Sequence, residues 1–555
     1  PEEENSIGRR LEEIEKASTF ISLLKDTDKS KNLLFSPSGN LTVFVPTNAA
    51  FDKLDDDRRK ALFSSGNKHW RERVLAYHAV HSDRIDGYIL SRVGLVKNGV
   101  GQYLKIGQDK QTVDGANVID WPIEYADLEP YYDKVERLVG VSGKAQPHAN
   151  AEPRSSADFP FPPTLEHPIS QRIDQAAQAL GFHALRVPRA ILSQPAMQRR
   201  ACEYSGFCGS FGCSSGAKGS SRAALLDQAV ASGRCEVRPH SQAFRLETDA
   251  QGRVTSVAYY DKDARPRRVD ARIYVVACQA IETSRLLLAS VGPRFPDGLA
   301  NNHGQVGRNL LFSAGGAGSG DMVFSDHDAV ESAALRVVGP FVNRALDDWY
   351  TIDDQRLGHA KGGIIEFLWD HPNAVARAQN AKWRNGELVW GSPLKRRLET
   401  WFRTDRTLNF EVFNDWLPND DCFVALDQGV KDRWGNAVAR VRIGAHPHDQ
   451  RIGRFLATKG EQLLSRLGAR RISSSVGPAP PPNLQAGGCR FGSAPQDSVL
   501  DPDCRAHEVD NLFVSDGSFM PTGGSVPYTF TIYANSFRVA DRIIDQLGGC
   551  RRKAG

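Results

Sequence analysis

The sequence lacks any apolar run close to the ~20 residues that a membrane-spanning helix requires, so a transmembrane segment is not expected. The acidic start, Pro1-Glu2-Glu3-Glu4, also lacks the basic stretch and apolar run of a signal peptide. These two absences predict a soluble chain and leave its cellular compartment open.

The chain has no strong excess of either charge, because its 70 Lys and Arg residues nearly balance its 66 Asp and Glu residues, which gives a net charge of +4. No basic stripe is interleaved with aromatic residues, so nucleic acid is not expected as a partner. The nine cysteines are an odd number and lack the spacing of a small disulfide-rich secreted domain. With 555 residues, 40% of them hydrophobic and 25% charged, the chain instead suits a globular protein of two to four domains.

The first 120 residues contain helix and strand patterns in turn. Apolar residues at helical spacing predict an amphipathic helix over Arg9–Leu24, and the β-branched and aromatic run Leu41–Pro46 predicts a short buried strand. The segments Thr42–Phe51 and Leu75–Val80 resemble the two signature motifs of fasciclin-like domains. That resemblance implies a small α+β adhesion or interaction module, through which a protein partner could bind, and it favours a structural role for His78.

This fasciclin-like module is expected to be truncated. The segment Thr112–Ile119 looks like a late strand of such a domain, but the family's closing strands do not follow it. The character of the sequence changes abruptly at Trp121, which places the boundary of the module at residues 1–120.

From residue 121 onward, helices and strands alternate. Helices are predicted from the Trp121-Pro122 turn through Tyr131, Val135 and Leu138, near Ile169–Leu180, and from Ile281 onward. Strand-like blocks are expected at Val237–Pro239, Ala243–Leu246, Val254–Tyr259, Ile273–Val276, Asn409–Phe413, Ala437–Val441 and Leu512–Val514.

Four blocks in this region match one family in the family's order. They are Trp121–Tyr132, Val275–Leu287, Gly298–Asn309 and Asn511–Thr522, and together they resemble the glucose–methanol–choline (GMC) oxidoreductases, especially the branch of gluconate and related sugar dehydrogenases. The resemblance implies a mixed α/β and α+β fold. It places a GMC N-terminal-type region at 121–310, a substrate-side domain at 311–475, and a C-terminal region that returns to the flavin domain at 476–555.

By this resemblance the cofactor would be FAD, and the reaction would be removal of a hydride from the CH–OH group of an alcohol, sugar or polyol. The Asp516-Gly517 pair follows an apolar strand, where glycine lets the backbone approach a cofactor closely and a following helix offers its N-terminus. The resemblance places Asp516 and Gly517 by the ribityl-pyrophosphate of FAD, and the segment with Pro527 and Thr529 beside its isoalloxazine ring. The alternative is that Asp516-Gly517 is only a turn.

The sequence departs from the family pattern at the nucleotide-binding motif. The family's Gly-x-Gly-x-x-Gly, which opens a pyrophosphate-binding helix, should precede the Trp121 block, and the fasciclin-like module stands there instead. The glycine cluster at Gly315–Gly320 has neither the spacing nor the position of that motif, so a flexible loop is expected there.

The catalytic positions depart from the family as well. Where the family has a histidine that acts as general base, this chain has Leu484, and near the second position it has Val526; neither residue can accept a proton. The neighbours Asn483, Gln485 and Tyr528 could orient a hydroxyl group, but none is a good base near neutral pH. His507 lies close to the final motif and is expected to be structural.

Three cysteines, Cys202, Cys208 and Cys213, lie within twelve glycine-rich residues. Three thiolates on a loop could hold an iron–sulfur cluster or a zinc ion, and the gluconate-dehydrogenase branch carries a cysteine-rich loop here. The alternatives are a disulfide with one free thiol, or reduced cysteines. The spacing of Cys489 and Cys504 favours a disulfide between them.

Three hypotheses follow from the sequence. The first is an FAD-dependent dehydrogenase or oxidase of CH–OH groups that completes its flavin site unusually, and a partner chain could supply the missing lobe. The second is a binding or scaffold protein whose degenerate oxidoreductase lobe no longer binds flavin. The third is an unnatural junction of two truncated domains at Asp120-Trp121.

Overall fold

The computed structural model describes residues 41–43, 79–81, 95–97, 103–105 and 116–548, except 209–211, 314, 355–356, 370–372, 385 and 478–483. The chain divides into two compact units, Pro1–Thr112 and Val113–Gly555.

The described part of the first unit consists of two antiparallel strand pairs. Strand β1 (Leu41–Val43) pairs with β2 (Ala79–His81), and β3 (Leu95–Lys97) pairs with β4 (Tyr103–Lys105). The strand predicted from Leu41 is therefore confirmed over its first three residues. The predicted helix at 9–24, residues 44–51 of the first motif and His78 lie outside the described residues.

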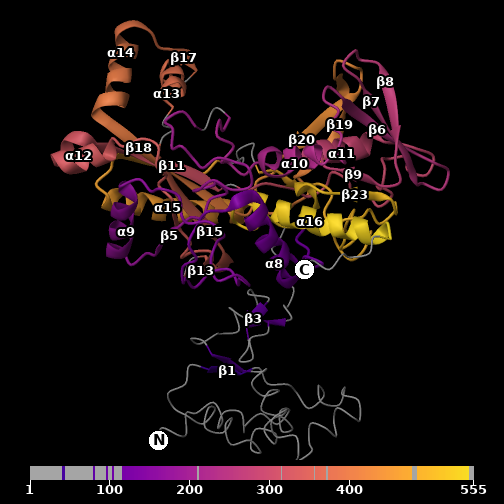
Figure 1. The fold of residues 1–555 in the computed structure, drawn as a ribbon, viewed down its shortest axis with the longest axis horizontal. Helices are drawn as coiled ribbons and strands as arrows, with labels where there is room; N and C mark the ends of the chain where they lie inside the picture. The colour runs from indigo at the N-terminus through magenta and orange to yellow at the C-terminus, as the bar shows by residue number, and fades with distance from the viewer. Residues whose placement is uncertain are drawn as a thin grey trace, which may run out of the picture. The chain divides into compact units, whose positions relative to one another are not determined.

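One half of the second unit is built on a six-stranded antiparallel sheet (Figure 1). The strand order is β21-β11-β18-β15-β12-β5, with β5 (Ala184–Arg186), β11 (Gly316–Val323), β12 (Arg344–Leu346), β15 (Gly363–Trp369), β18 (Asp405–Asn414) and β21 (Arg470–Ser475). Alternation along β15 buries Ile365, Phe367 and Trp369. These side chains share a core with apolar residues of α9 (Ile169–Ala179) and α15 (Pro447–Arg466), which cover the sheet.

The glycine cluster at Gly315–Gly320 belongs to this sheet, so the expectation of a flexible loop there is wrong. Strand β11 pairs on one side with β18 and on the other with β21. Glycine is required because the ring of Phe410 lies against the strand: a Cβ at Gly318 would come within 2.2 Å of that ring. The run serves close packing within a central strand.

Shorter elements connect the strands of this half. They are η6 (Phe324–Asp326), α12 (Ala329–Leu335), β13 (Thr351–Asp354), β14 (Gly358–Lys361), α13 (Ala374–Ala381), β16 (Trp383–Arg384), β17 (Glu387–Leu388), α14 (Gly391–Glu399) and η7 (Thr400–Thr404). The segment from α13 to η7 is an excursion between β15 and β18, seen at the top of the sheet half in Figure 1.

The other half of the second unit surrounds a second core. Its sheet of three antiparallel strands, β6 (Gln242–Thr248), β7 (Val254–Tyr260) and β8 (Pro266–Asp270), lies next to a two-stranded parallel pair, β9 (Tyr274–Val276) and β23 (Leu512–Val514). The remaining elements are α8 (Tyr125–Val135), η4 (Glu136–Gly140), η5 (Arg222–Leu226), α10 (Asp227–Ala231), α11 (Ala280–Ala289), β10 (Leu310–Leu311), β19 (Phe423–Lys431), β20 (Ala437–Arg442), β22 (Ala486–Gly487), η8 (Gly517–Phe519) and α16 (Thr529–Gln546).

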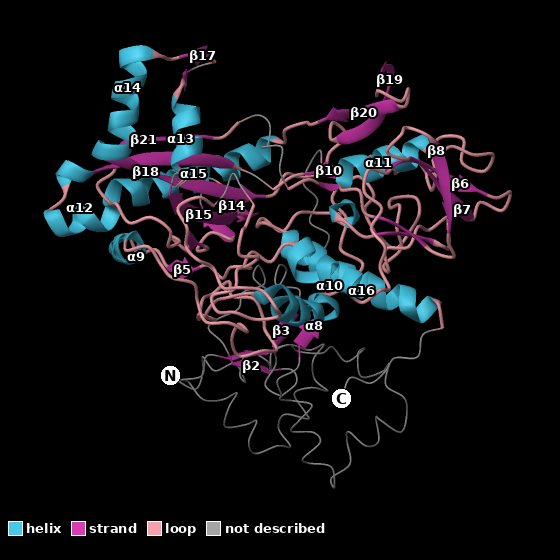
Figure 2. Cartoon of the chain, turned by 45° about the horizontal axis from the view of Figure 1, so that its top comes forward, coloured by secondary structure: helices cyan, strands magenta, loops and turns pink. Residues whose placement is uncertain are grey.

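Helices α8 and α16, far apart in the sequence, lie side by side in both views (Figures 1 and 2). The ring of Tyr132 stacks on Phe530 with centroids 5.1 Å apart, and the Tyr131 hydroxyl donates to Asp541 at 2.9 Å. Just before α8, Trp121 packs edge-on against Phe491 and Phe519. The start of this unit is therefore fixed to its C-terminal region.

Most of the predicted elements of the second unit are present. The helices predicted after Trp121, at 169–180 and from residue 281 are α8, α9 and α11, and six of the seven strand-like blocks fall on β6, β7, β9, β18, β20 and β23. Val237–Pro239 is a loop instead, because Pro239 has no N–H to offer a sheet. Residues 116–119 are the described part of the predicted late strand at 112–119, and they are not a strand either. The backbone N–H of Asn117 instead donates to the Pro418 carbonyl at 2.7 Å.

Asp449 in the first turn of α15 gives a pH-dependent prediction. Its side chain is 3% exposed and accepts the Leu417 N–H at 2.8 Å, and burial raises its pKa to about 8. Because the folded-state pKa lies above the unfolded value, the free energy of unfolding should fall as pH rises from about 4 to about 8, by on the order of 4 kcal/mol.

Asp449→Asn keeps an oxygen for the Leu417 N–H and removes this titration. Urea unfolding followed from pH 5 to 9 should show the decline in the native protein and a flatter profile in the variant, which becomes the more stable of the two above pH 8. Asp421→Asn, at a side chain 61% exposed, is the control and should follow the native profile. Parallel profiles for the native protein and Asp449→Asn would contradict the assignment.

Candidate active site

The centre of the candidate site is the Asp516 carboxylate, directly after β23. One oxygen accepts the Gln279 N–H at 3.0 Å and the Thr283 hydroxyl at 2.5 Å. The other accepts the N–H and hydroxyl of Ser518 at 2.8 and 2.5 Å. The side chain is 8% exposed, so a buried negative charge with four donors joins the end of β23 to the start of α11.

Gly517 lies where the backbone of two segments meets. A Cβ on Gly517 would lie 2.9 Å from the Gln485 carbonyl oxygen, and the 3₁₀ turn η8 at Gly517–Phe519 follows at once. The sequence predicted a helix N-terminus here, but η8 is only three residues long. The glycine is therefore explained by a close approach to the backbone at Gln485.

The two parallel strands end together next to this carboxylate. Strands β9 and β23 pair in register from Leu512↔Tyr274 to Val514↔Val276, and residues 277–279 after β9 are exposed. In open parallel sheets, ligands bind beyond the carboxyl ends of the strands. Among the described residues β9 pairs only with β23, and its Val275 side chain is 48% exposed.

The residues that the sequence predicted at catalytic positions, Leu484 and Val526, do not form an acid–base pair. Leu484 has a positive φ of 52°, and its carbonyl oxygen accepts the Tyr528 hydroxyl. Gln485 accepts the side-chain amide of Gln279, and the Val526 carbonyl accepts the Ser313 hydroxyl at 3.1 Å. Asn483 lies outside the described residues.

Tyr528 is buried, with 1% exposure, and burial together with the charge of Asp415 holds the pKa of its hydroxyl far above the usual range. It therefore stays protonated near neutral pH, donates to the Leu484 carbonyl and cannot act as a base. Pro527 is half-buried just before it, and Thr529 is the exposed first residue of α16.

Two charged residues that the sequence did not single out lie at this end of α16. Asp415 accepts the Ser525 N–H at 2.9 Å and pairs with Lys361, whose ammonium lies 3.0 Å away and also donates to the Gly523 carbonyl at 3.1 Å. They hold the loop before Pro527. No spacing links residues 361, 415 and 525, so the sequence carries no signal for this group.

His507 lies away from the strand ends. Its ring nitrogen Nε2 lies 2.9 Å from the Ser498 hydroxyl, and its backbone N–H donates to the Val499 carbonyl at 3.1 Å. Burial lowers the pKa of the ring. These bonds hold the turn before β23, which suits the structural role expected for this histidine.

The three clustered cysteines are free thiols. Cys213 accepts from the Lys218 N–H at 3.5 Å, and the Cys208 thiol lies 3.5 Å from the Ser205 carbonyl oxygen. Burial raises the pKa of Cys213, but hydrogen bonds from Ser215 and Lys218 outweigh it and lower that pKa overall. Within the described residues the three sulfur atoms do not form a group with mutual distances under 4.8 Å.

The expected disulfide between Cys489 and Cys504 is not formed. Both thiols are fully buried in the core around β9 and β23, one 3.8 Å from the Ser284 hydroxyl and the other accepting the Asn535 amide at 3.3 Å. Burial raises each pKa to about 12. The two residues occupy separate positions in one apolar core, which their spacing in the sequence could not reveal.

A cavity of about 610 Å³ lies between α11 and β19. Leu288, Val306 and Val424 form apolar parts of its wall, and Asn309 and Asn419 are among its polar groups. The side-chain oxygen of Asn309 is buried without a hydrogen-bond partner. The volume falls in the range of small-molecule sites, about 300–1,000 Å³.

No helix in the described part of the chain has the length and apolar character to cross a bilayer.

Comparison with known proteins identifies the parts of the chain. Residues 15–127 match the fasciclin domain, and residues 117–313 and 418–536 match the N- and C-terminal models of the GMC oxidoreductases. The 6'''-hydroxyparomomycin C oxidase of Streptomyces lividus is 33% identical over 79% of this chain and 74% of its own. The paromamine 6'-oxidase of Streptomyces fradiae is 33% identical over 89% and 84%.

Among solved structures, pyridoxine 4-oxidase from Mesorbium loti is similar at a TM-score of 0.47 and 16% identity, over 78% of this chain and 79% of that one. The two family models cover the segments of β9 and β23 and, in the sheet half, those of α9 and α15, whereas β11, β12, β15 and β18 lie between the two matched ranges. The chain therefore belongs to the GMC oxidoreductase family and carries a fasciclin domain before its oxidoreductase region.

Proposed function

We propose that this protein is an oxidoreductase that oxidises the CH–OH group of a small alcohol or sugar, with FAD as its cofactor. The observation that carries the proposal is the order of both GMC models over one compact unit. Two Streptomyces relatives are oxidases of paromamine and of a paromomycin, which makes amino sugars with a primary hydroxyl the first substrates to test.

The described residues supply only one side of a flavin site. The carboxyl ends of β9 and β23 and the exposed residues 277–279 offer a surface for such a cofactor. The four donors to Asp516 are all groups of the protein itself. This carboxylate therefore orients α11 and η8, and both of its oxygens accept hydrogen bonds without a cofactor. A complete site needs a phosphate-binding element from outside the residues that the structure describes. When bound, FAD would accept the hydride.

A binding or scaffold role is the second candidate. It is favoured by Leu484 and Val526, which replace both proton-accepting positions of the family. In this role the fasciclin domain would bind a protein partner. That the three cysteines hold an iron–sulfur cluster or a zinc ion remains a prediction.

Visible absorption of the purified full chain separates the two candidates. The oxidoreductase proposal expects the twin bands of a flavin, release of FAD in acid, and bleaching of the bands by paromamine without an added electron acceptor. A colourless protein that also fails to take up added FAD would overturn it and leave the binding role.

Leu484→His tests the missing base. A histidine here is expected to raise turnover of an accepted alcohol by about 10²–10⁴-fold, since general base catalysis contributes that much. Leu484→Gln, polar but unable to take a proton, is the control and should leave turnover near the native level. Turnover measured with an artificial electron acceptor decides, and equal rates for both variants would show that position 484 does not face the substrate.

A further inference from the structure

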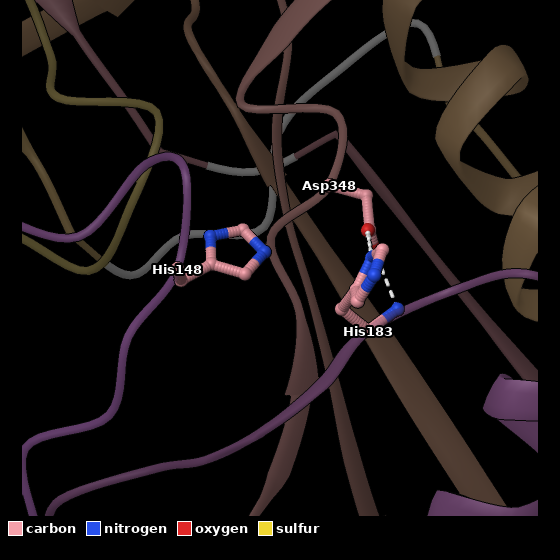
Figure 3. A group of neighbouring side chains, drawn as sticks. All are labelled: His148, His183 and Asp348. Carbon is pink, nitrogen blue, oxygen red and sulfur yellow. Dashed lines mark hydrogen bonds and ion pairs between the residues drawn. The ribbon is translucent and has the colours of Figure 1, made fainter. Parts of the chain in front are cut away.

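Two histidines and an aspartate meet in the six-stranded-sheet half of the molecule. His148 lies on the loop after η4, His183 just before β5, and Asp348 just after β12 (Figure 3). One potential ligand atom from each lies within 4.8 Å of the other two. Because β5 and β12 pair antiparallel, with Leu346 opposite Ala184, the end of one strand lies beside the start of the other.

The His183–Asp348 pair is already formed. The His183 Nδ1 lies 2.6 Å from one carboxylate oxygen of Asp348, and the His183 N–H donates to the other at 3.0 Å. Figure 3 shows these two contacts, with the ring of His148 to the left of the pair. The pair therefore holds an imidazole and a carboxylate at one point, and an ion bound by both would replace the hydrogen bond between them.

The His148 ring is built into the protein. Its side chain is 6% exposed, and its Nδ1 accepts the Asn150 N–H at 3.1 Å. An ion bound at Nε2 would require the ring proton on Nδ1, so binding would replace this hydrogen bond. Asn150 also donates its side-chain amide to the Asp347 carbonyl at 2.7 Å, which joins the His148 loop to the end of β12.

The surroundings are negative. The carboxylates of Asp347 and Asp348 are 15% and 16% exposed, and an Asp347 oxygen lies 3.8 Å from His148 Nδ1. The two adjacent carboxyl groups are therefore largely buried beside the two rings and offer oxygen ligands to an ion placed there.

We propose that His148, His183 and Asp348 bind a divalent ion of the zinc type, with water as the fourth ligand and Asp347 as a supporting carboxylate. Two imidazoles and one carboxylate suit Zn²⁺ or Co²⁺, whereas Mg²⁺ and Ca²⁺ prefer oxygen ligands. His183 is the mobile member, because its side chain is 74% exposed and can adjust the 2.6 Å contact to the spacing of two metal ligands. The ion would tie the His148 loop to β5 and β12.

Cobalt serves as the probe. The full chain is treated with chelator, titrated with Co²⁺, and followed through the visible bands of the bound ion and by displacement with Zn²⁺. His183→Ala and Asp348→Asn should each weaken binding by at least about 100-fold, more than the loss of a supporting group. Asp347→Asn should weaken it by about tenfold. Because the His183 side chain is exposed, His183→Ala should leave the fold intact, so weaker binding by this variant reports loss of the ligand and not unfolding.

Two controls keep the outcome specific. His303→Ala replaces another exposed histidine, 3.7 Å from Glu508, and should bind Co²⁺ like the native protein. Cys213→Ser removes a thiol of the cysteine-rich loop. The proposal is overturned if the native chain shows no cobalt bands, if His183→Ala binds as the native chain does, or if the spectrum has a strong thiolate-to-cobalt band that Cys213→Ser abolishes.

Discussion

Replacing Asp516 by alanine is expected to lower the free energy of unfolding by about 3–5 kcal/mol, because it leaves buried donors without their charged acceptor. The Gln279 N–H, the Thr283 hydroxyl and both donors of Ser518 lose their partner at once. The start of α11 and the η8 turn would then lose the carboxylate that joins them to the end of β23.

Urea unfolding monitored by circular dichroism measures this effect. Asp510→Ala is the matched control, since its side chain is on the same segment, 67% exposed, and makes a single ion pair with Arg253 at 3.0 Å. An exposed pair of this kind is worth about 0–1 kcal/mol. If Asp516→Ala unfolds like Asp510→Ala, the carboxylate does not join the segments as described.

Gly307→Ala is expected to cost about 3–5 kcal/mol. The added Cβ would lie 2.1 Å from the Val424 carbonyl oxygen, and the residue has a φ of +84°. Its N–H donates to the Gly488 carbonyl at 2.6 Å, and its own carbonyl accepts from Val424 at 2.7 Å, so the chain cannot move away without losing both bonds. Backbone strain and overpacking each contribute about 1–3 kcal/mol.

The same loop provides the control. Gly304 also has a positive φ, +65°, but a Cβ there would meet nothing within 4 Å. Gly304→Ala should therefore cost only the backbone strain, about 1–2 kcal/mol. Calorimetric Tm values would compare the two, and limited proteolysis would show whether Gly307→Ala releases the β19–β20 ribbon. Equal Tm values would mean that Val424 moves aside freely.

Local patterns in the sequence predicted the regular elements, because alternation and helical spacing reflect burial on one face. Strands such as β7 and β18 and helices such as α9 follow from these patterns. The glycine run at Gly315–Gly320 was misjudged because the reason for it, the ring of Phe410 on the neighbouring strand, lies about ninety residues further along the chain. Strand β8 was missed because its five residues are exposed and carry no apolar alternation.

The site could be predicted only where the motif residues themselves make the contacts. Asp516 was identified from the sequence, but its donors Gln279 and Thr283 come from a distant segment. Lys361 and Asp415 belong to no motif, and the pairing of Cys489 with Cys504 looked plausible by spacing alone. Contacts of this type depend on tertiary packing, which one sequence read by itself does not contain.

The pairing of β9 with β23 has a consequence for synthesis of the chain on the ribosome. The last strand of the six-stranded sheet, β21, ends at Ser475, so that sheet has all its strands before β23 at Leu512–Val514 leaves the ribosome. Domains generally fold as they emerge. During translation β9 and the apolar residues around it therefore remain unpaired while residues 277–511, about half of the second unit, are made, and this interval is when the nascent chain most needs a chaperone.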